Sequence, residues 1–171
     1  ARLFDSYFAD YAGVWRHGDW IAIDEHGASV IYGRSDATIN RKGLRLGSAE
    51  IYQAVEGLDT VLDSLVVDLE FLGRDSFMPL FVVPAAGLPF DDTLKEQINA
   101  AIRAQVSARF VPNEIIEIAE VPRTLSGKKL EVPVKKLLLG GDPDTVVNRD
   151  SMANPESFDF FTAYAHARAN T

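Results

Sequence analysis

The spacing of apolar side chains along the chain predicts several helices. The clearest spans residues 91–109, and its apolar row consists of Leu94, Ile98, Ile102 and Val106. Positions that recur every four residues share one helix face, so this stretch should pack that face on a core. A second helix should begin at Ser48, a good N-cap residue, and run to Gly57.

Weaker helical patterns lie at both ends of the chain. Residues 2–15 place leucine, phenylalanine and tyrosine at helix-like spacing up to Gly13. Residues 132–141 predict a short helix ended by two glycines, and residues 154–170 predict a last amphipathic helix.

The runs of β-favouring residues are short and bounded by turn residues. Residues 19–34 form two such runs joined at Glu25, His26 and Gly27, which predicts a β-hairpin. Three further strands are expected within residues 64–71, 79–85 and 113–122. The polar stretch between the hairpin and the Ser48 helix, residues 35–47, is interpreted as a connection.

The order of these elements predicts a small α+β unit with helices on a three-stranded sheet. Residues 1–35 do not fit that unit, and we interpret them as a helix plus β-hairpin that close a larger preceding domain. The compact unit should then cover residues 36–140, with a boundary near Ser35 and Asp36. Residues 141–171 should form a tail that carries the last amphipathic helix.

Composition narrows the classes of function. The 171 residues contain no cysteine and three histidines, so no disulfide or thiolate metal site is possible and a zinc site is not expected. The formal net charge of −8 argues against nucleic-acid binding and against binding to an anionic membrane. No apolar run is long enough to span a membrane, and no signal-peptide pattern opens the chain. We therefore expect a cytoplasmic protein.

Positive charge nevertheless gathers in one segment. It contains Arg123, Lys128, Lys129, Lys135 and Lys136. Within it, the stretch VPRTLSGKKLE places Gly127 directly before Lys128, an arrangement that often presents an ammonium to a phosphate. It is not a nucleotide-triphosphate P-loop, because Pro122 stands where the first glycine would be needed. On its residues alone, such a lysine is more often a solvated residue at a turn.

Three separated stretches resemble one family. WRHGDW, GRSDATINRKGLRLGSAEIY and VPRTLSGKK are similar to the C-terminal core motifs of AMP-forming acyl-CoA synthetases, which belong to the adenylate-forming superfamily. The resemblance covers essentially the whole chain. The Ser/Thr/Gly-rich phosphate loop of the family is absent, so the resemblance implies a mobile C-terminal lid preceded by the last hairpin of the large domain.

The resemblance also implies a reaction, in which an acid, ATP and CoA give an acyl-CoA through an acyl-adenylate. The residues of these motifs and of the tail NRDSMANPESFDFF most resemble the branch of the family that activates acetoacetate. Acetate or propionate are alternative substrates, because the acyl pocket of the family lies in the large domain. A module that binds CoA or an adenylate without catalysis is a further alternative.

For the nucleotide, the resemblance implies roles for four residues. Asp19 matches the aspartate that binds both ribose hydroxyls, and Arg34 matches an arginine at the ribose and a phosphate. Arg45 would meet the α-phosphate during thioester formation, and Asp36 matches the hinge about which the lid turns. Without the resemblance, Asp19 is interpreted as a turn aspartate and Arg34 as a surface ion-pair residue. Arg45 would then belong to a tight turn before the Ser48 helix, and Asp36 to a linker.

For CoA and the first half-reaction, three more positions match. Gly43 would let the pantetheine chain approach the backbone, and Arg103, with Arg109 as the fallback, would contact a CoA phosphate. Lys128 matches the lysine that assists adenylation, and its acetylation by a lysine acetyltransferase, reversed by a deacetylase, would remove the charge. Glu50 is read as helix N-terminal charge. Mg²⁺ would be bound mainly by ATP and the large N-terminal domain, which is also the expected partner.

Overall fold

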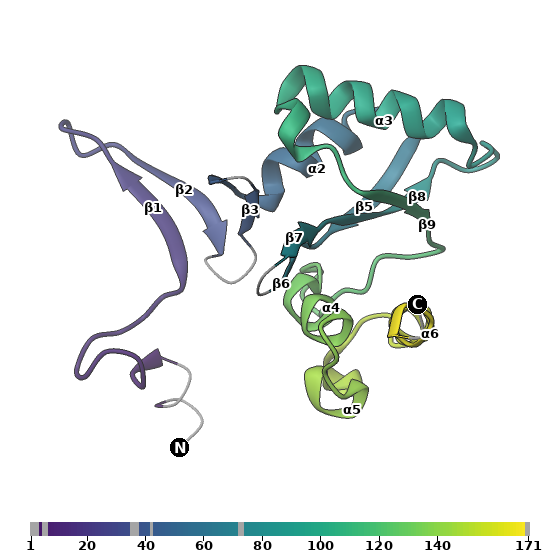
Figure 1. Ribbon diagram of the computed structural model, residues 1–171. Coiled ribbons are helices and arrows are strands. Elements are labelled where there is room, and N and C mark those ends of the chain that lie inside the picture. Colours follow the sequence, from purple (N-terminus) through teal and green to yellow (C-terminus); the bar gives the residue numbers. More distant parts are fainter. Residues whose placement is uncertain (1–3, 5–6, 35–37, 42, 72–73, 170–171) are drawn as a thin grey trace.

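The computed structural model describes residues 4, 7–34, 38–41, 43–71 and 74–169 (Figure 1). The strands are β1 (Asp19–Ile23), β2 (Ser29–Arg34), β3 (Ile39–Arg41), β4 (Leu44–Leu46), β5 (Val61–Val66), β6 (Leu69–Phe71), β7 (Arg74–Phe77), β8 (Pro79–Pro84) and β9 (Glu114–Glu117). The helices are α2 (Ser48–Glu56), α3 (Asp92–Gln105), α4 (Glu131–Leu138), α5 (Pro143–Val146) and α6 (Ser157–Ala169). Two 3₁₀ turns cover Ala108–Phe110 and Arg149–Ser151.

The centre of the fold is a three-stranded sheet in the order β5-β8-β9. Strand β8 pairs antiparallel with β5 and parallel with β9. Side chains alternate along β8, so Leu80 and Val82 enter the cluster with α2 and α3, while Phe81 and Val83 enter the cluster with α4 and α6. Helices therefore cover both faces of the sheet (Figure 1). The predicted α+β fold with a three-stranded sheet is confirmed.

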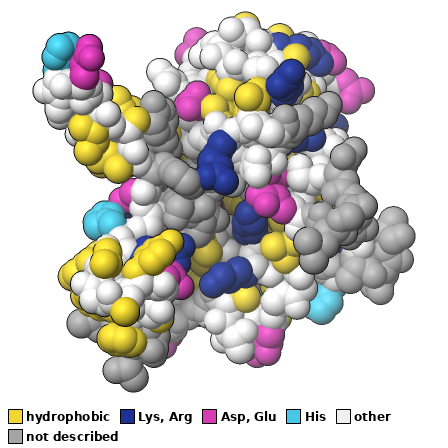
Figure 2. Space-filling model, turned by 60° about the vertical axis from the view of Figure 1, so that its left-hand side comes forward, with side chains coloured by type: hydrophobic (Ala, Val, Ile, Leu, Met, Phe, Trp, Pro, Cys, Tyr) yellow, Lys and Arg dark blue, Asp and Glu magenta, His cyan; other side chains and the backbone are white. Residues whose placement is uncertain are grey.

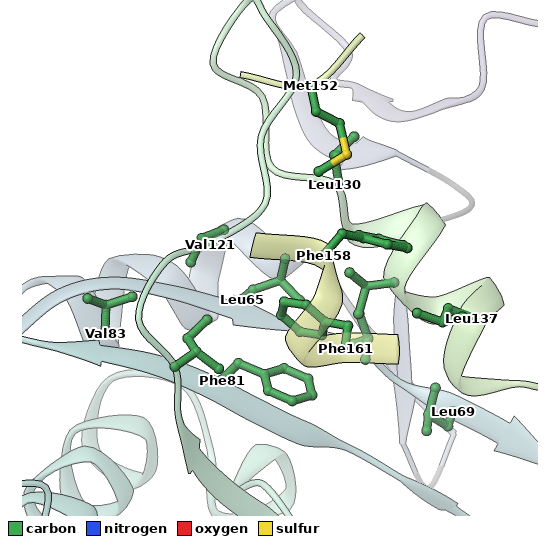
Figure 3. Close-up of a cluster of buried hydrophobic side chains, with 13 residues drawn as sticks. Leu65, Leu69, Phe81, Val83, Val121, Leu130, Leu137, Met152, Phe158 and Phe161 are labelled. Atoms are coloured by element: carbon green, nitrogen blue, oxygen red, sulfur yellow. The ribbon is translucent and has the colours of Figure 1, made fainter. Parts of the chain in front are cut away.

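The α4–α6 side of the sheet holds the larger aromatic core. Phe81, Phe158 and Phe161 are fully buried, and the rings of Phe81 and Phe161 meet edge to face at 4.8 Å. Figure 3 shows Phe81 on β8 directed at Phe161 of α6, with Leu137 of α4 beside them. The helix predicted over residues 154–170 is thus held to the sheet by aromatic packing.

Strands β1 and β2 form the predicted hairpin, and Gly27 in its turn has a φ of 82° that suits glycine. The hairpin projects from the sheet, and Figure 2 shows hydrophobic side chains along it. Ile23 and Ile31 are each 66% exposed. Exposed apolar side chains gathered on one projecting element are typical of a surface that packs on another protein or domain.

Several sequence interpretations of single elements are wrong. Residues 38–46, read as connection, contain the short hairpin β3–β4, and the run 64–71 is divided between β5 and β6, which lie in different sheets. The described residues 8–13 form turns and bends, so the first helical pattern does not continue to Gly13. Gly47 rather than Ser48 caps α2, with extended backbone angles and no side-chain cap.

The longest helix, α3, agrees with its prediction more closely. Asp91 is its N-cap and accepts a hydrogen bond from the Leu94 amide at 3.0 Å. The helix ends at Gln105, and a separate 3₁₀ turn follows at Ala108–Phe110. No helix in the described part of the chain is long and apolar enough to cross a membrane.

Candidate active site

Residues 123–129 form a tight loop, which we call the lysine loop. The Thr124 amide donates to the Lys128 carbonyl at 2.9 Å, and the Gly127 amide donates to the Thr124 carbonyl at 2.8 Å. The Lys128 amide donates to the Thr124 hydroxyl at 3.0 Å. Gly127 has a φ of 83°, which favours glycine. The loop is therefore held by its own backbone, and Lys128 is presented at its exposed tip.

The next residue, Lys129, has the opposite environment. Its ammonium bonds Glu56, lies 3.0 Å from Asp63 and donates to the Ser64 carbonyl at 2.6 Å. It also lies 3.8 Å from the centre of the Tyr52 ring, a cation–π contact. The two consecutive lysines therefore differ in exposure and in partners. Lys129 is a β-bridge partner of Arg123 and its side chain turns inward, whereas Lys128 is exposed.

Asp63 forms ion pairs with both Lys129 and Arg123. Arg123 donates to it at 2.6 Å, and the Asp63 side chain is only 19% exposed. Burial alone would raise the pKa of Asp63, but hydrogen bonds from Arg123 and Lys129 outweigh it and leave the pKa below 3.8. The stabilisation linked to this shift is present above that pH and is lost as the pH falls through the lowered pKa.

These contacts show which residues of the basic segment are already paired. Of the five cations within residues 123–136, Arg123 and Lys129 are neutralised by Asp63 and Glu56. Lys135 also faces an acid, with its ammonium 4.0 Å from Glu70. In the part of the chain that the structure describes, Lys128 and Lys136 are the cations of this segment for which no ion pair is found.

A second polar cluster joins α4 to α2. Glu131, the first residue of α4, accepts hydrogen bonds from the Ser48 hydroxyl at 2.8 Å and from the Tyr52 hydroxyl at 2.5 Å. The Tyr52 oxygen in turn accepts from the Val66 amide at 3.2 Å. Burial, followed by the charge of Glu131, raises the pKa of Tyr52 well above 10.0. Nothing in the sequence marked this cluster, since its members come from three separate segments.

Replacing Tyr52 by phenylalanine should lower the free energy of unfolding at neutral pH by about 1–3 kcal/mol, because Glu131 and the Val66 amide lose a partner. The raised pKa adds a pH dependence. The native chain keeps the Tyr52 proton where the unfolded chain loses it, so native stability falls above pH 10.0. Tyr52→Phe should make that fall shallower.

Urea unfolding at neutral pH and above the ordinary tyrosine pKa measures both effects. The control is Tyr11→Phe, since Tyr11 is 61% exposed and should change neither quantity. An unchanged stability for Tyr52→Phe at both pH values would contradict the assigned role of the hydroxyl.

The residues expected to act in thioester formation lie on the β3–β4 hairpin. Gly43 occupies its turn with a φ of 80°, and a side chain there would meet open space. Arg45 is exposed on β4, opposite Asn40. The turn explains why glycine is needed, while the predicted roles of Gly43 at CoA and of Arg45 at phosphate stay predictions.

Helix α2 contacts both this hairpin and the segment around the lysine loop. The hairpin runs into the first turn of α2 at Ser48, whereas Lys129 contacts Glu56 in the last turn. Glu131, two residues after Lys129, bonds Ser48 and Tyr52. The β3–β4 hairpin and the lysine loop are therefore separate elements beside one helix.

The backbones of Asp19 and Arg34 are opposite each other in the register of β1 and β2. The His17 ring nitrogen Nδ1 lies 2.6 Å from the Asp19 carboxylate. The hinge prediction at Asp36 lies outside the described residues. Arg103 lies on the exposed side of α3 with its guanidinium 3.5 Å from Glu96, and its role in CoA binding stays a prediction.

The expected Mg²⁺ would need oxygen ligands from acidic side chains. Among the described residues, no group of three or more histidine, aspartate or glutamate side chains is placed to hold a metal ion. Mg²⁺ prefers octahedral oxygen ligands, often supplied by substrate phosphates with one or two carboxylates. This part of the chain therefore offers no dedicated Mg²⁺ site.

Known proteins resemble the chain over nearly its full length, although no protein-family model matches it. It is 43% identical to acetoacetyl-CoA synthetase of Rattus norvegicus over 157 residues, which are 91% of this chain and 23% of that protein. It is 41% identical to acetoacetyl-coenzyme A synthetase of Rhizobium meliloti, over 94% of this chain and 24% of that protein.

A solved structure gives the same result. Acetoacetyl-CoA synthetase from Streptomyces lividans superposes with a TM-score of 0.87 at 47% identity, covering 98% of this chain and 25% of that one. The chain thus spans about a quarter of the length of these relatives. The resemblance first seen in the sequence motifs is confirmed, and the fold matches the C-terminal domain of adenylate-forming enzymes.

Proposed function

Because the chain belongs to the AMP-forming acyl-CoA synthetases of the adenylate-forming superfamily, we propose that it is the C-terminal part of an acetoacetate–CoA ligase. The complete enzyme converts acetoacetate, ATP and CoA into acetoacetyl-CoA, AMP and diphosphate. One observation carries the proposal. Two adjacent lysines have separate tasks, in which Lys129 fixes a loop and Lys128 is left exposed on it.

In the first half-reaction, a carboxylate oxygen of acetoacetate attacks the α-phosphorus of ATP. The bond from that phosphorus to the bridging oxygen breaks, and diphosphate leaves with the electron pair. Lys128 donates from its ammonium to both approaching anions, where negative charge accumulates. Asp19 accepts the two ribose hydroxyls, and Arg34 binds the ribose and a neighbouring phosphate.

In the second half-reaction, the lid turns about Asp36 and presents the β3–β4 hairpin. The CoA sulfur attacks the acyl carbonyl, and AMP leaves as the carbon–oxygen bond breaks. Arg45 binds the α-phosphate, Gly43 admits the pantetheine chain, and Arg103 binds a CoA phosphate. The β3–β4 hairpin and the lysine loop are separate elements, which supports this division, because a rotation of the lid can present one after the other.

The surroundings of the enzyme belong to the same proposal. The exposed apolar hairpin β1–β2 supports packing against the large N-terminal domain, which is the principal partner. Mg²⁺ is bound there and by the ATP phosphates. Exposure of Lys128 makes it accessible to a lysine acetyltransferase and a deacetylase. The proposed location of the enzyme is the cytoplasm.

The substrate is tested with a complete synthetase that carries this segment. Diphosphate release is measured with acetoacetate, acetate and propionate at saturating ATP and CoA. We expect kcat/KM for acetoacetate to exceed the other two by at least about tenfold, which is the lower range of discrimination by one small group. Preference for acetate or propionate contradicts the assigned substrate. CoA binding in calorimetry without diphosphate release from any acid contradicts catalysis.

A further inference from the structure

The lysine loop is clamped from the side of the sheet by one ion-paired arginine. Arg123 donates from one guanidinium nitrogen to Asp63 at 2.6 Å and from the other to the Gly127 carbonyl at 2.7 Å. The Gly127 carbonyl belongs to the peptide bond that joins Gly127 to Lys128. The guanidinium is therefore hydrogen-bonded to the backbone directly before Lys128. Because the guanidinium is planar and its donors are fixed relative to one another, the position of Asp63 determines where Arg123 can hold that peptide.

The same carboxylate also fixes the other end of the loop. Lys129, directly after Lys128, lies 3.0 Å from the second oxygen of Asp63. Asp63 in turn is placed by β5, where its neighbour Ser64 pairs with Val82 of β8. The residues on both sides of Lys128 therefore depend on one side chain of the central sheet.

A third support comes from the chain after α5. The Leu125 amide donates to the Ser151 carbonyl and the Ala153 amide donates to the Arg123 carbonyl, each at 3.0 Å. Thr124 forms a β-bridge with Met152, which is 4% exposed. None of these bonds reaches residues 127–129, where the contacts of Asp63 with Arg123 and Lys129 add to the hydrogen bonds within the loop.

We propose that Asp63 is a positioning residue for adenylation: through Arg123 and Lys129 it fixes the backbone on both sides of Lys128, so that this ammonium reaches the α-phosphate in one orientation. The inference rests on the proposed function, because it assumes that Lys128 acts at the α-phosphate of ATP during adenylation. It goes further by assigning a role to residues that contact neither substrate. Since a misplacement of about 1 Å costs on the order of 100-fold in rate, loss of the clamp should be visible in kinetics.

The test uses Asp63→Asn in a complete synthetase that carries this segment. Single-turnover formation of acyl-adenylate should slow by about 10- to 100-fold with an unchanged KM for ATP. Thioester formation from supplied acyl-adenylate and CoA should be unchanged, because it uses the β3–β4 hairpin. Arg123→Lys, which cannot reach Asp63 and Gly127 together, should give the same pattern.

A mutant cycle separates positioning from general destabilisation. In a Lys128→Ala background, Asp63→Asn should slow adenylation no further, since the side chain that it positions is gone. The control is Asp59→Asn, an exposed carboxylate on the same α2–β5 connection, which should change neither half-reaction. Equal losses in both half-reactions for Asp63→Asn and Arg123→Lys, or additive losses with Lys128→Ala, would overturn the inference. Full adenylation by Lys128→Ala itself would instead overturn the proposed function.

Discussion

Replacing Lys128 by alanine should slow acyl-adenylate formation by about 100- to 1,000-fold, the cost of losing one preorganised donor at a centre of developing charge. The fold should not change. The loop is held by the Lys128 amide and carbonyl, which alanine keeps, and the described part of the chain shows no ion pair to the ammonium. Thioester formation from supplied acetoacetyl-adenylate and CoA should continue at the native rate, because Arg45 and Gly43 are untouched.

Rapid-quench measurement of both half-reactions in the complete synthetase checks this result. Lys136→Ala is the matched control, because Lys136 is another exposed lysine, two helical turns or less from the same loop, on α4. It should leave both rates unchanged. If Lys128→Ala kept rapid adenylation and lost thioester formation instead, the two faces of the lid would have been assigned in the wrong order.

The sequence singled out Lys128, because it directly follows Gly127 and matches a lysine of the family, but it did not reveal the different environment of Lys129. The role of Lys128 in adenylation stays a prediction. The difference in environment is set by Glu56, which lies 73 positions before Lys129, and by Asp63, which contacts Lys129 and lies 60 positions before Arg123. Contacts over such distances leave no periodic signal in the sequence, so the neutralisation of Lys129 and Arg123 required the structure.

The fold was predicted best where apolar spacing persisted over many residues. The apolar row of α3 and the buried strand β8 follow directly from that pattern. Strands β3 and β4 have three residues each, too few for a period of two to stand out. The division of residues 64–71 was missed because Asp68, in an apolar run, is buried and accepts the Asn40 amide at 2.9 Å.

The largest loss of stability is expected from Phe81→Ala. Phe81 is fully buried on β8, with ring centres of Phe161 and Tyr164 at 4.8 and 5.4 Å. Removing a buried phenylalanine ring costs about 3–5 kcal/mol, because apolar contacts are lost and a cavity remains. Urea unfolding should show this loss. Phe160→Ala is the control, since that ring is 39% exposed and its removal should cost about 1 kcal/mol or less.

Because side chains alternate along β8, the loss of packing in Phe81→Ala is confined to one face of the sheet. Phe81 packs with α4 and α6, whereas its neighbours Leu80 and Val82 pack with α2 and α3. Hydrogen exchange of Phe81→Ala should therefore accelerate in α6 more than in α3, because α6 loses its main aromatic contact. The lysine loop bonds the segment just before α6, so its amides should exchange faster too. Equal acceleration in α3 and α6 would mean that the two sides of the sheet unfold as one unit.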